Sequence, residues 1–174
     1  MKPLFCLFFM ILLPSLCLAL ASDQNKPITM RADQVELQQA KQLGLFKGHV
    51  EVDQGSSHLR SGSAIAYTDK HNKILKAVAI GTSKKQASFT TTQKPHEPAL
   101  HAYADSITFY PQDNRIVLEG NATLHKGMNK FSAAIIKYDI KNQHVISQED
   151  KQGNGRTTII IHPQKKKQPW LKAP

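Results

Sequence analysis

Cysteine is nearly absent from this sequence, and it is confined to one end. The chain has 174 residues and two cysteines, Cys6 and Cys17, so every later position is free of thiols. The main body therefore has no cysteine zinc site, no intramolecular disulfide framework and no cysteine nucleophile. A chain of this length buries a sizeable core without such staples, and it suits one domain or two small ones.

Long apolar runs are also missing, except at the start. Leu4 to Leu13 form an unbroken apolar run, Pro14 breaks it, and Ala19-Leu20-Ala21 supplies the small residues that signal peptidase requires. This pattern predicts a secretory signal peptide over residues 1–21, cleaved after Ala21. An uncleaved anchor is the alternative, because residues 4–21 approach the lower length limit of a membrane span.

Acidic residues are scarce relative to basic ones. There are 13 Asp and Glu against 23 Lys and Arg, which gives a formal charge of +10. Such a charge indicates an anionic partner, with nucleic acid, anionic lipid and phosphorylated glycan all open at this point. The export signal argues against nucleic acid. Part of the excess lies in residues 164–174, whose Lys, Gln and Pro content predicts a basic, flexible C-terminal tail.

Patterns typical of catalytic and metal sites are missing as well. The eight histidines are scattered, and neither an HExxH motif nor a His-rich tract occurs, so we expect no metal and no cofactor. Asp33 and Asp105 are candidates for a carboxylate pair of the kind glycosidases use. A structural role at a strand entry, bonding local backbone, is the preferred interpretation. We therefore expect a protein that is not an enzyme.

What the sequence does contain is alternation of polar and apolar residues. His49-Val50-Glu51-Val52-Asp53 and Ala122-Thr123-Leu124-His125 both alternate, which places their apolar side chains on one face of a sheet. Turn signals such as Pro111-Gln112-Asp113-Asn114 separate these runs at strand-length intervals. The pattern predicts an all-β fold: a sandwich, a jelly roll or an open barrel.

The chain also matches itself at an offset of 72 residues. Gly48 falls on Gly120, Gly55 falls on Gly127, and the apolar positions around them coincide without a gap over nearly thirty residues. After that stretch the match of Tyr67 with Tyr138 predicts a slip of one residue. We interpret the match as an internal duplication. Gly48 and Gly120 are predicted to have positive φ at a bulge or tight turn.

The ordered set of segments resembles the OstA-like domain family of lipopolysaccharide transport proteins. Residues 46–55, FKGHVEVDQG, are similar to its F-x-G-N-V-x-V-x-Q-G signature, with His49 in place of the asparagine. Residues 75–81, LKAVAIG, and 117–122, VLEGNA, are similar to two further segments of the family. The match spans residues 27–163, and its specificity lies in the order of the motifs.

The resemblance implies a twisted, V-shaped jelly roll of stacked antiparallel strands over residues 22–163. It also implies a periplasmic bridge that holds lipopolysaccharide acyl chains between its sheets. The bridge would carry the lipid from the inner-membrane transport complex to the outer-membrane translocon. LptC-like and LptD-like proteins and head-to-tail copies of the chain are the implied partners. The alternative is an exported glycan-binding or adhesin β-sandwich without lipid transport.

The alternation nominates side chains for such a site, although an ordinary core has the same pattern. The candidate lining residues are Ile28, Met30, Val35, Leu37, Val50, Val52, Phe89, Ile107, Phe109, Leu118, Leu124 and Phe131, with the three phenylalanines as the strongest. The candidate cations for an anionic headgroup near the groove mouth are Arg31, Lys47, Lys76, Lys84 and Lys85. The first and last strands, about residues 28–32 and 157–162, are predicted to be edges that pair with neighbouring copies.

Overall fold

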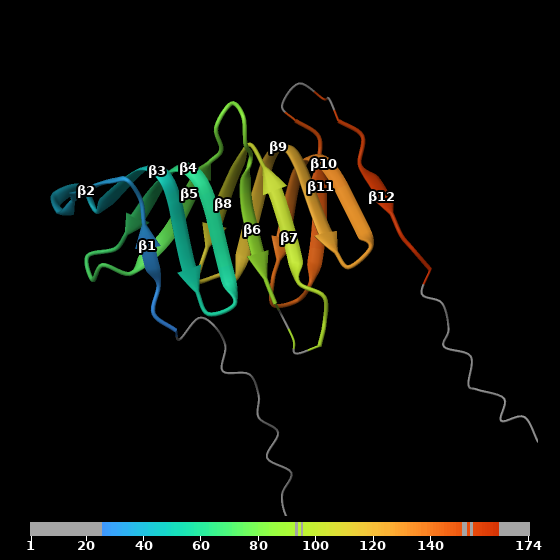
Figure 1. Cartoon of the computed structure of the whole chain (residues 1–174), viewed down its shortest axis with the longest axis horizontal. Coiled ribbons are helices and arrows are strands. Elements are labelled where there is room, and N and C mark those ends of the chain that lie inside the picture. Colours follow the sequence, from blue (N-terminus) through green and yellow to red (C-terminus); the bar gives the residue numbers. More distant parts are fainter. Residues whose placement is uncertain (1–25, 93, 95, 151–152, 154, 164–174) are drawn as a thin grey trace, which may run out of the picture.

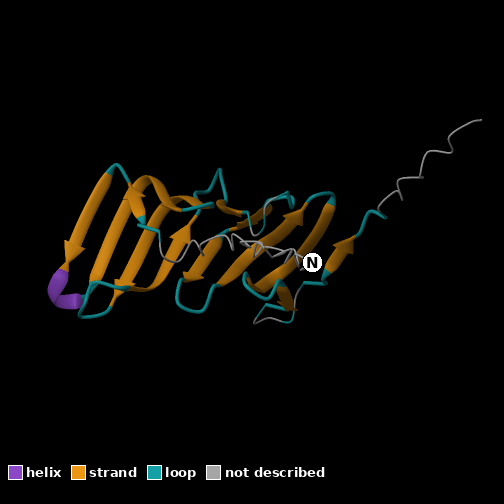
Figure 2. Cartoon of the chain, turned by 90° about the horizontal axis from the view of Figure 1, so that it is seen from below, coloured by secondary structure: helices purple, strands orange, loops and turns teal. Residues whose placement is uncertain are grey.

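The computed structural model describes residues 26–92, 94, 96–150, 153 and 155–163. The predicted signal peptide over residues 1–21 and the predicted tail over residues 164–174 lie outside the described residues. The described residues form an elongated body in which strands follow one another along the long axis (Figures 1 and 2). No helix among the described residues is long and apolar enough to cross a membrane.

The described residues form strands and one 3-10 turn, so the predicted all-β class is confirmed. The first half of the body contains β1 (Thr29–Arg31), β2 (Gln34–Gln38), β3 (Leu43–Gln54), β4 (Ser57–Thr68), β5 (Ile74–Ile80) and β6 (Ala87–Thr91), with the 3-10 turn over Gln39–Lys41. The second half contains β7 (Leu100–Ala104), β8 (Ser106–Tyr110), β9 (Arg115–Lys126), β10 (Asn129–Asp139), β11 (His144–Gln148) and β12 (Thr158–Ile160). Every strand pairing is antiparallel.

The four long strands β3, β4, β9 and β10 pass through two layers and bend where their pairing shifts. The shift lies between Lys47 and Val50 in the first pair, and between Ala133 and Ile135 in the second. One half of each long strand joins β2, β5, β8 and β11 in a back layer. The other halves join β1, β6, β7 and β12 in a front layer (Figure 1).

We call the line along which the two layers meet the crease. It contains the bends of the long strands at residues 48–49, 62, 120–121 and 134. It also contains the short links at residues 32–33, 81–86 and 105. Each repeat closes the crease in the same way, because the backbone N–H of Asp33 donates to the carbonyl of Gly48 and that of Asp105 donates to Gly120, at 3.0 and 2.9 Å.

The two glycines at these bends have the predicted backbone conformation. Gly48 has φ 74° and Gly120 has φ 78°, in the left-handed region that glycine adopts without strain. A Cβ atom at either position would also collide with the side chain of Asp33 or Asp105. The next residue repeats the pattern, since His49 Nδ1 lies 2.8 Å from Asp33 Oδ2 and Asn121 Nδ2 donates to Asp105 Oδ2 at 2.9 Å. The two carboxylates therefore belong to equivalent structural contacts, one in each repeat.

The structure confirms the internal duplication. Strands β8 and β9 have the bounds of β2 and β3 moved by 72 residues. The predicted slip of one residue is wrong, however. Tyr67 pairs with Leu43, and Arg115 is the equivalent of Leu43 in the second repeat. Arg115 pairs with Asp139, so Asp139 is the equivalent of Tyr67. Tyr138 therefore corresponds to Ala66, and the offset of 72 continues through β10.

Side chains become larger with distance from the crease. The inward row of the front layer next to the crease is mostly small, with Val50 as its largest member: Val50, Ser61, Ala87, Ala104, Ala122 and Ala133. The next inward row contains Leu59, Phe89, Ala102, Leu124 and Phe131. Because the layers are joined at the crease and larger side chains separate them further away, the body is wedge-shaped in section. This is the expected twisted, V-shaped jelly roll.

Candidate functional site

An apolar pocket lies between the layers on the side opposite the crease, and we call it the mouth. Its walls come from both layers of the first repeat and the start of the second: Ile28, Met30, Val52, Gln54, Ser57, Leu59, Ile74, Ala77, Phe89, Phe109 and Pro111. The residual cavity is about 20 Å³, so the walls nearly touch. The mouth is thus a closed apolar seam rather than an open channel.

Two aromatic rings close this seam. Phe89 projects from the front layer and Phe109 from the back layer, and their ring centroids are 5.9 Å apart with an interplanar angle of 32°. Phe89 is fully buried, whereas Phe109 is half-buried. Such a tilted pair contributes about 0.5–1.5 kcal/mol beyond the burial of its surface. Separating the two layers at the mouth therefore requires that this contact be broken.

The front layer carries one continuous apolar row on its inner face. Each member is the direct cross-strand partner of the next, from one edge of the layer to the other: Met30, Val52, Leu59, Phe89, Ala102, Leu124, Phe131 and Ile159. The row passes through the mouth and continues through the core of the second repeat. An apolar chain lying along it would find hydrophobic contact over the whole length of the body.

The predicted lining residues divide into three groups. Ile28, Met30, Val52, Phe89 and Phe109 come together in the mouth. Val50, Ile107, Leu118, Leu124 and Phe131 lie in the hydrophobic cores between the layers. Val35 and Leu37 are 52% and 66% exposed, because β2 is an edge strand that pairs only with β3 among the described strands.

Sequence reasoning missed six residues of the mouth, the polar Gln54 and Ser57 and four apolar residues. Leu59 lies on an alternating segment, His58-Leu59-Arg60, so the same period-two rule had the signal to find it. Ala77 lies in the strand segment that resembles the family, but it is too small to be singled out. Ile74 and Pro111 lie at the ends of turns, where alternation assigns no face.

The predicted headgroup cations do not gather at the mouth. Lys84 and Lys85 belong to the 81–86 link at the crease, and Lys47 and Arg31 lie next to the crease on β3 and β1. Lys76 is the exception, because β5 brings it to the mouth end of the back layer. Alternation sets the face of a side chain, but the layer topology sets its distance from the mouth.

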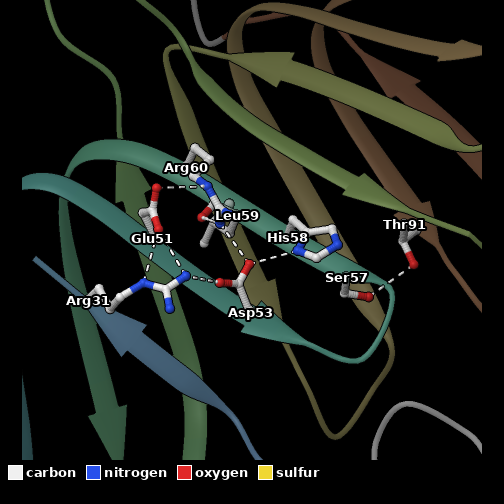
Figure 3. A network of polar contacts seen from close by, with 8 residues as sticks. All are labelled: Arg31, Glu51, Asp53, Ser57, His58, Leu59, Arg60 and Thr91. Carbon is white, nitrogen blue, oxygen red and sulfur yellow. Dashed lines mark hydrogen bonds and ion pairs between the residues drawn. The ribbon is translucent and has the colours of Figure 1, made fainter.

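Arg31 takes part in a polar network on the outer face of the front layer (Figure 3). It pairs with Glu51 and Asp53 at 3.0 and 2.8 Å, and Arg60 and His58 contact Asp53 at 2.8 and 2.7 Å. Partial burial pushes the pKa of Asp53 upward, but hydrogen bonds and charge from His58 and Arg60 outweigh it, so the pKa lies below its ordinary value. The network ties the edge strand β1 to β3 and β4.

Histidines are more frequent on the second half of that outer face. His101 and His125 are direct partners on β7 and β9, and Tyr103 packs edge-on against His125 with centroids 6.2 Å apart. Burial, with the charges of Lys130 and His101, lowers the pKa of His125. Within the described ranges, no group of three or more His, Cys, Asp or Glu side chains is arranged to hold a metal ion.

Comparisons with known proteins agree on one family. Residues 29–144 match the family described as "LptA/(LptD N-terminal domain) LPS transport protein". The chain is 30% identical over 159 residues to the lipopolysaccharide export system protein LptH of Pseudomonas aeruginosa, covering 88% of this chain and 89% of that protein. It is 27% identical over 146 residues to LptA of Escherichia coli K12, covering 84% and 77% respectively.

The fold agrees with the sequence matches. A crystal structure of LptH, the LptA homologous periplasmic component of the lipopolysaccharide transport device of Pseudomonas aeruginosa, superposes with a TM-score of 0.75 at 27% identity. The superposition covers 82% of this chain and 99% of that chain. The wedge, the crease and the mouth therefore belong to a fold shared with a protein of lipopolysaccharide transport.

Proposed function

Because the chain belongs to the LptA and LptD N-terminal-domain family of lipopolysaccharide transport proteins, we propose that it is a periplasmic bridge that binds lipopolysaccharide and carries it from the inner-membrane transport complex to the outer-membrane translocon. The observation that carries this proposal is the apolar row from Met30 to Ile159, which crosses the whole front layer and passes through the mouth. The family consists of transport proteins, and we propose no enzymatic reaction.

The proposed ligand site is the space between the layers. An acyl chain that enters the mouth gains about 0.8 kcal/mol for each buried methylene group. This gain is not directional, so the chain can slide along the row without breaking specific bonds. Entry requires Phe89 and Phe109 to separate, and the acyl chain then replaces the apolar contact that each ring loses.

The proposed bridge is built by head-to-tail contact between copies, and the junction inside one chain provides its template. Within the chain, the end of the first repeat pairs with the start of the second through β5 with β8 and β6 with β7. By the duplication, β11 and β12 correspond to β5 and β6, while β1 and β2 correspond to β7 and β8. All four are edge strands among the described residues.

The template also specifies a register. Val145 corresponds to Ala77, because each pairs with the equivalent residue of its own repeat, and Leu37 corresponds to Phe109. Since Ala77 pairs with Phe109 inside the chain, Val145 is expected to pair with Leu37 of the next copy. Ile159 likewise corresponds to Phe89, and Met30 corresponds to Ala102. Since Phe89 pairs with Ala102 inside the chain, Ile159 is expected to pair with Met30 of the next copy. The exposed Leu37 and Ile159 would thereby become buried, and the apolar row would continue into the next copy.

The same edges are the proposed contacts for the other partners. We propose that LptC-like and LptD-like proteins add strands to β1–β2 or β11–β12. Removal of residues 157–174 is then expected to lower self-association in analytical ultracentrifugation. If the shortened chain associated as strongly as the full chain does, the proposed pairing through β12 would be contradicted.

The proposed location is the periplasm, reached by export and cleavage after Ala21. The apolar run and the Ala-x-Ala site support this proposal, as does the description of LptH as a periplasmic component. Mass measurement of the protein purified from the periplasmic fraction tests it, because cleavage after Ala21 predicts a chain that starts at Ser22. A mass that includes residues 1–21 would contradict cleavage.

Photo-crosslinking tests the proposed site directly. A photoreactive phenylalanine analogue at position 89, 109 or 131 is expected to crosslink to purified lipopolysaccharide. The same analogue at Tyr103, an exposed aromatic position on the outer face of the front layer, is the matched control and is expected to give none. Equal labelling at all positions would contradict the internal site, and binding of soluble oligosaccharide alone would favour a glycan-binding sandwich.

A further inference from the structure

Four side chains form a ladder across the outer face of the back layer. Tyr67 on β4 is the direct partner of Lys76 on β5, and Tyr110 on β8 is the direct partner of Arg115 on β9. Ala77 and Phe109 are direct partners on β5 and β8. Lys76 is the neighbour of Ala77, and Tyr110 the neighbour of Phe109, on the side that faces away from the crease. We call these four residues the cation–aromatic ladder, because the two residue types alternate over four neighbouring strands.

The contacts inside the ladder are close. Lys76 Nζ lies 4.4 Å from the centroid of the Tyr67 ring, and Arg115 Cζ lies 4.5 Å from the centroid of the Tyr110 ring. Both cations are thus held against aromatic rings rather than extended into solvent. Such contacts position a charge at a cost of little further side-chain entropy when a ligand binds.

The ladder borders the mouth. Successive side chains of a strand point to opposite faces, so Lys76 and Tyr110 project outward on the strands from which Ala77 and Phe109 project into the mouth. Pro111, which directly follows Tyr110, also lines the mouth. The ladder therefore runs along the outer side of the rim that the back layer contributes.

The charges of the ladder are available to an anion. Lys76 forms no ion pair with any carboxylate among the described residues, and Arg115 pairs only at 3.2 Å with the exposed Asp113. An exposed pair of this kind is weak, so a phosphate can displace it. The two cations suit phosphate groups, and the Tyr67 and Tyr110 rings hold these cations in place.

We propose that the cation–aromatic ladder binds the phosphorylated saccharide headgroup of a lipopolysaccharide molecule whose acyl chains enter the mouth. The proposal rests on the proposed function and names the place of the headgroup. An amphiphile at the rim has its acyl chains inside and its polar part in water, and the ladder is the cationic surface that lies next to that boundary.

The ladder occurs at one place in the chain. At the equivalent junction between two copies, the corresponding residues are Asp139 and His144 of one copy and Gln38 and Leu43 of the next. That set lacks both the aromatic rings and the permanent positive charges. The proposed headgroup sites are therefore spaced one per copy along a bridge, at its middle rather than at its joints.

The test compares two double variants that remove the same charge. Lys76→Gln with Arg115→Gln changes the ladder, and Lys84→Gln with Lys85→Gln changes the crease on the far side of the molecule. Displacement of a hydrophobic dye by purified lipopolysaccharide gives the affinity. We expect the ladder variant to bind roughly tenfold more weakly, from the loss of charge-assisted hydrogen bonds, and the crease variant to bind as the unchanged protein does.

Further arms identify the group that is recognised. With enzymatically dephosphorylated lipopolysaccharide, the difference in affinity between the ladder variant and the unchanged protein is expected to disappear. Adding millimolar inorganic phosphate to the dephosphorylated lipid is expected not to restore this difference in affinity. Tyr110→Ala is expected to weaken binding, whereas Tyr110→Phe keeps the ring and the affinity. Urea unfolding of each variant establishes that the fold is retained.

Failure of this proposal is distinguishable from failure of the proposed function. If the unchanged protein does not bind lipopolysaccharide, the proposed function fails. If it binds and the ladder variant binds equally well, the ladder has no role in recognition and the proposal is overturned. An equal loss of affinity in the crease variant would also overturn the proposal, because the effect would then come from net charge. If the ladder variant lost as much affinity for dephosphorylated lipopolysaccharide as for the intact lipid, the proposal would be overturned too.

Discussion

Leu37 and Phe109 occupy equivalent positions in the two repeats, but only Phe109 has a neighbouring strand beyond it. Phe109 pairs with Ala77 of β5 and packs against the main core, whereas Leu37 is 66% exposed at the edge of β2. The strand pairing that buries Phe109 inside the chain is thus missing for Leu37 among the described residues, which leaves the edge of β2 open to another copy.

A cysteine pair tests that joint at single-residue resolution. In Leu37→Cys with Val145→Cys, oxidation is expected to give reductant-sensitive oligomers on a non-reducing gel, because the template places these two residues of neighbouring copies directly opposite each other. The body of the protein has no cysteine of its own, so no other thiol competes.

The control pair differs from the test pair by one position. Glu36→Cys with Val145→Cys places one thiol on the opposite face of β2, since a shift of one residue reverses the face of a strand. This pair is expected to remain monomeric on the gel. Equal crosslinking of both pairs would show that the copies meet in another register.

The aromatic contact at the mouth contributes strongly to stability. Phe89→Ala is expected to lower the free energy of unfolding by about 3–5 kcal/mol, because it removes a fully buried ring and leaves a cavity. Phe109→Ala is expected to cost less, because that ring is half-buried. Urea unfolding followed by fluorescence measures both, with Tyr103→Ala on the exposed outer face as the control. A cost at Tyr103 equal to that at Phe89 would contradict the assignment.

The crease glycines are expected to resist substitution. Gly48→Ala and Gly120→Ala each force an L-residue into the left-handed region, at about 1–2 kcal/mol, and also push a Cβ atom against the aspartate of the same repeat. Gly127→Ala is the matched control, because its φ is 61° but the nearest atom is Pro98 Cγ at 3.4 Å. Thermal unfolding is expected to rank both crease variants below the control. An equal loss in all three would assign no role to the aspartate contact.

The pH dependence of stability is expected to report on Asp53. Because the pKa of Asp53 is lowered in the folded state, the unfolded chain takes up its proton first. This part of the stability therefore begins to fall below the ordinary value of 3.8 and is lost as the pH falls through the lowered folded-state pKa. Asp53→Asn is therefore expected to destabilise at pH 7 and to converge with the unchanged protein at low pH. Urea midpoints between pH 7 and pH 3 measure the difference, and parallel curves would contradict the role of the network.

A second pH effect has its origin at His125. Its pKa is lowered in the folded state by burial and by neighbouring positive charge, so protonation below the ordinary value of 6.5 favours the unfolded chain. The stability of the unchanged protein is expected to fall between pH 7 and pH 5, and His125→Gln is expected to flatten that part of the curve. A slope that is the same in His125→Gln as in the unchanged protein would contradict this assignment.

Much of the fold was predictable because it depends on local alternation and on glycine. The segments around Val50 and Leu124 alternate, and both are found on inner faces. Gly48 and Gly120 revealed the offset between the two repeats, and both are glycine because only a residue without a side chain fits beside the aspartate. The predicted slip at Tyr67 was wrong because two tyrosines matched by type, whereas pairing with β3 and β9 sets the true correspondence.

The candidate site was predictable in its chemistry but not in its position. Alternation placed Phe89 and Phe109 on inner faces, yet it carries no information on whether a residue lies near the crease or near the mouth. That distance depends on where each long strand bends and on which half-strand is its neighbour. Lys84 and Lys76 are both basic and eight residues apart, and the topology sends one to the crease and the other to the rim.

Every backbone crossing between the layers that the described residues make lies on the crease, and the remaining turns connect strands within one layer. Within the described part of the chain, opening the layers at the mouth therefore breaks no strand ladder. The resistance to such opening comes from apolar side-chain contact, at about 25 cal/mol for each Å² of apolar surface, and from the hydrogen bond that Lys126 Nζ donates to Gln143 Oε1 at 3.0 Å. On the proposed function, we expect a lipid that supplies equal apolar surface to enter or leave sideways through the mouth, while the strand ladders stay intact.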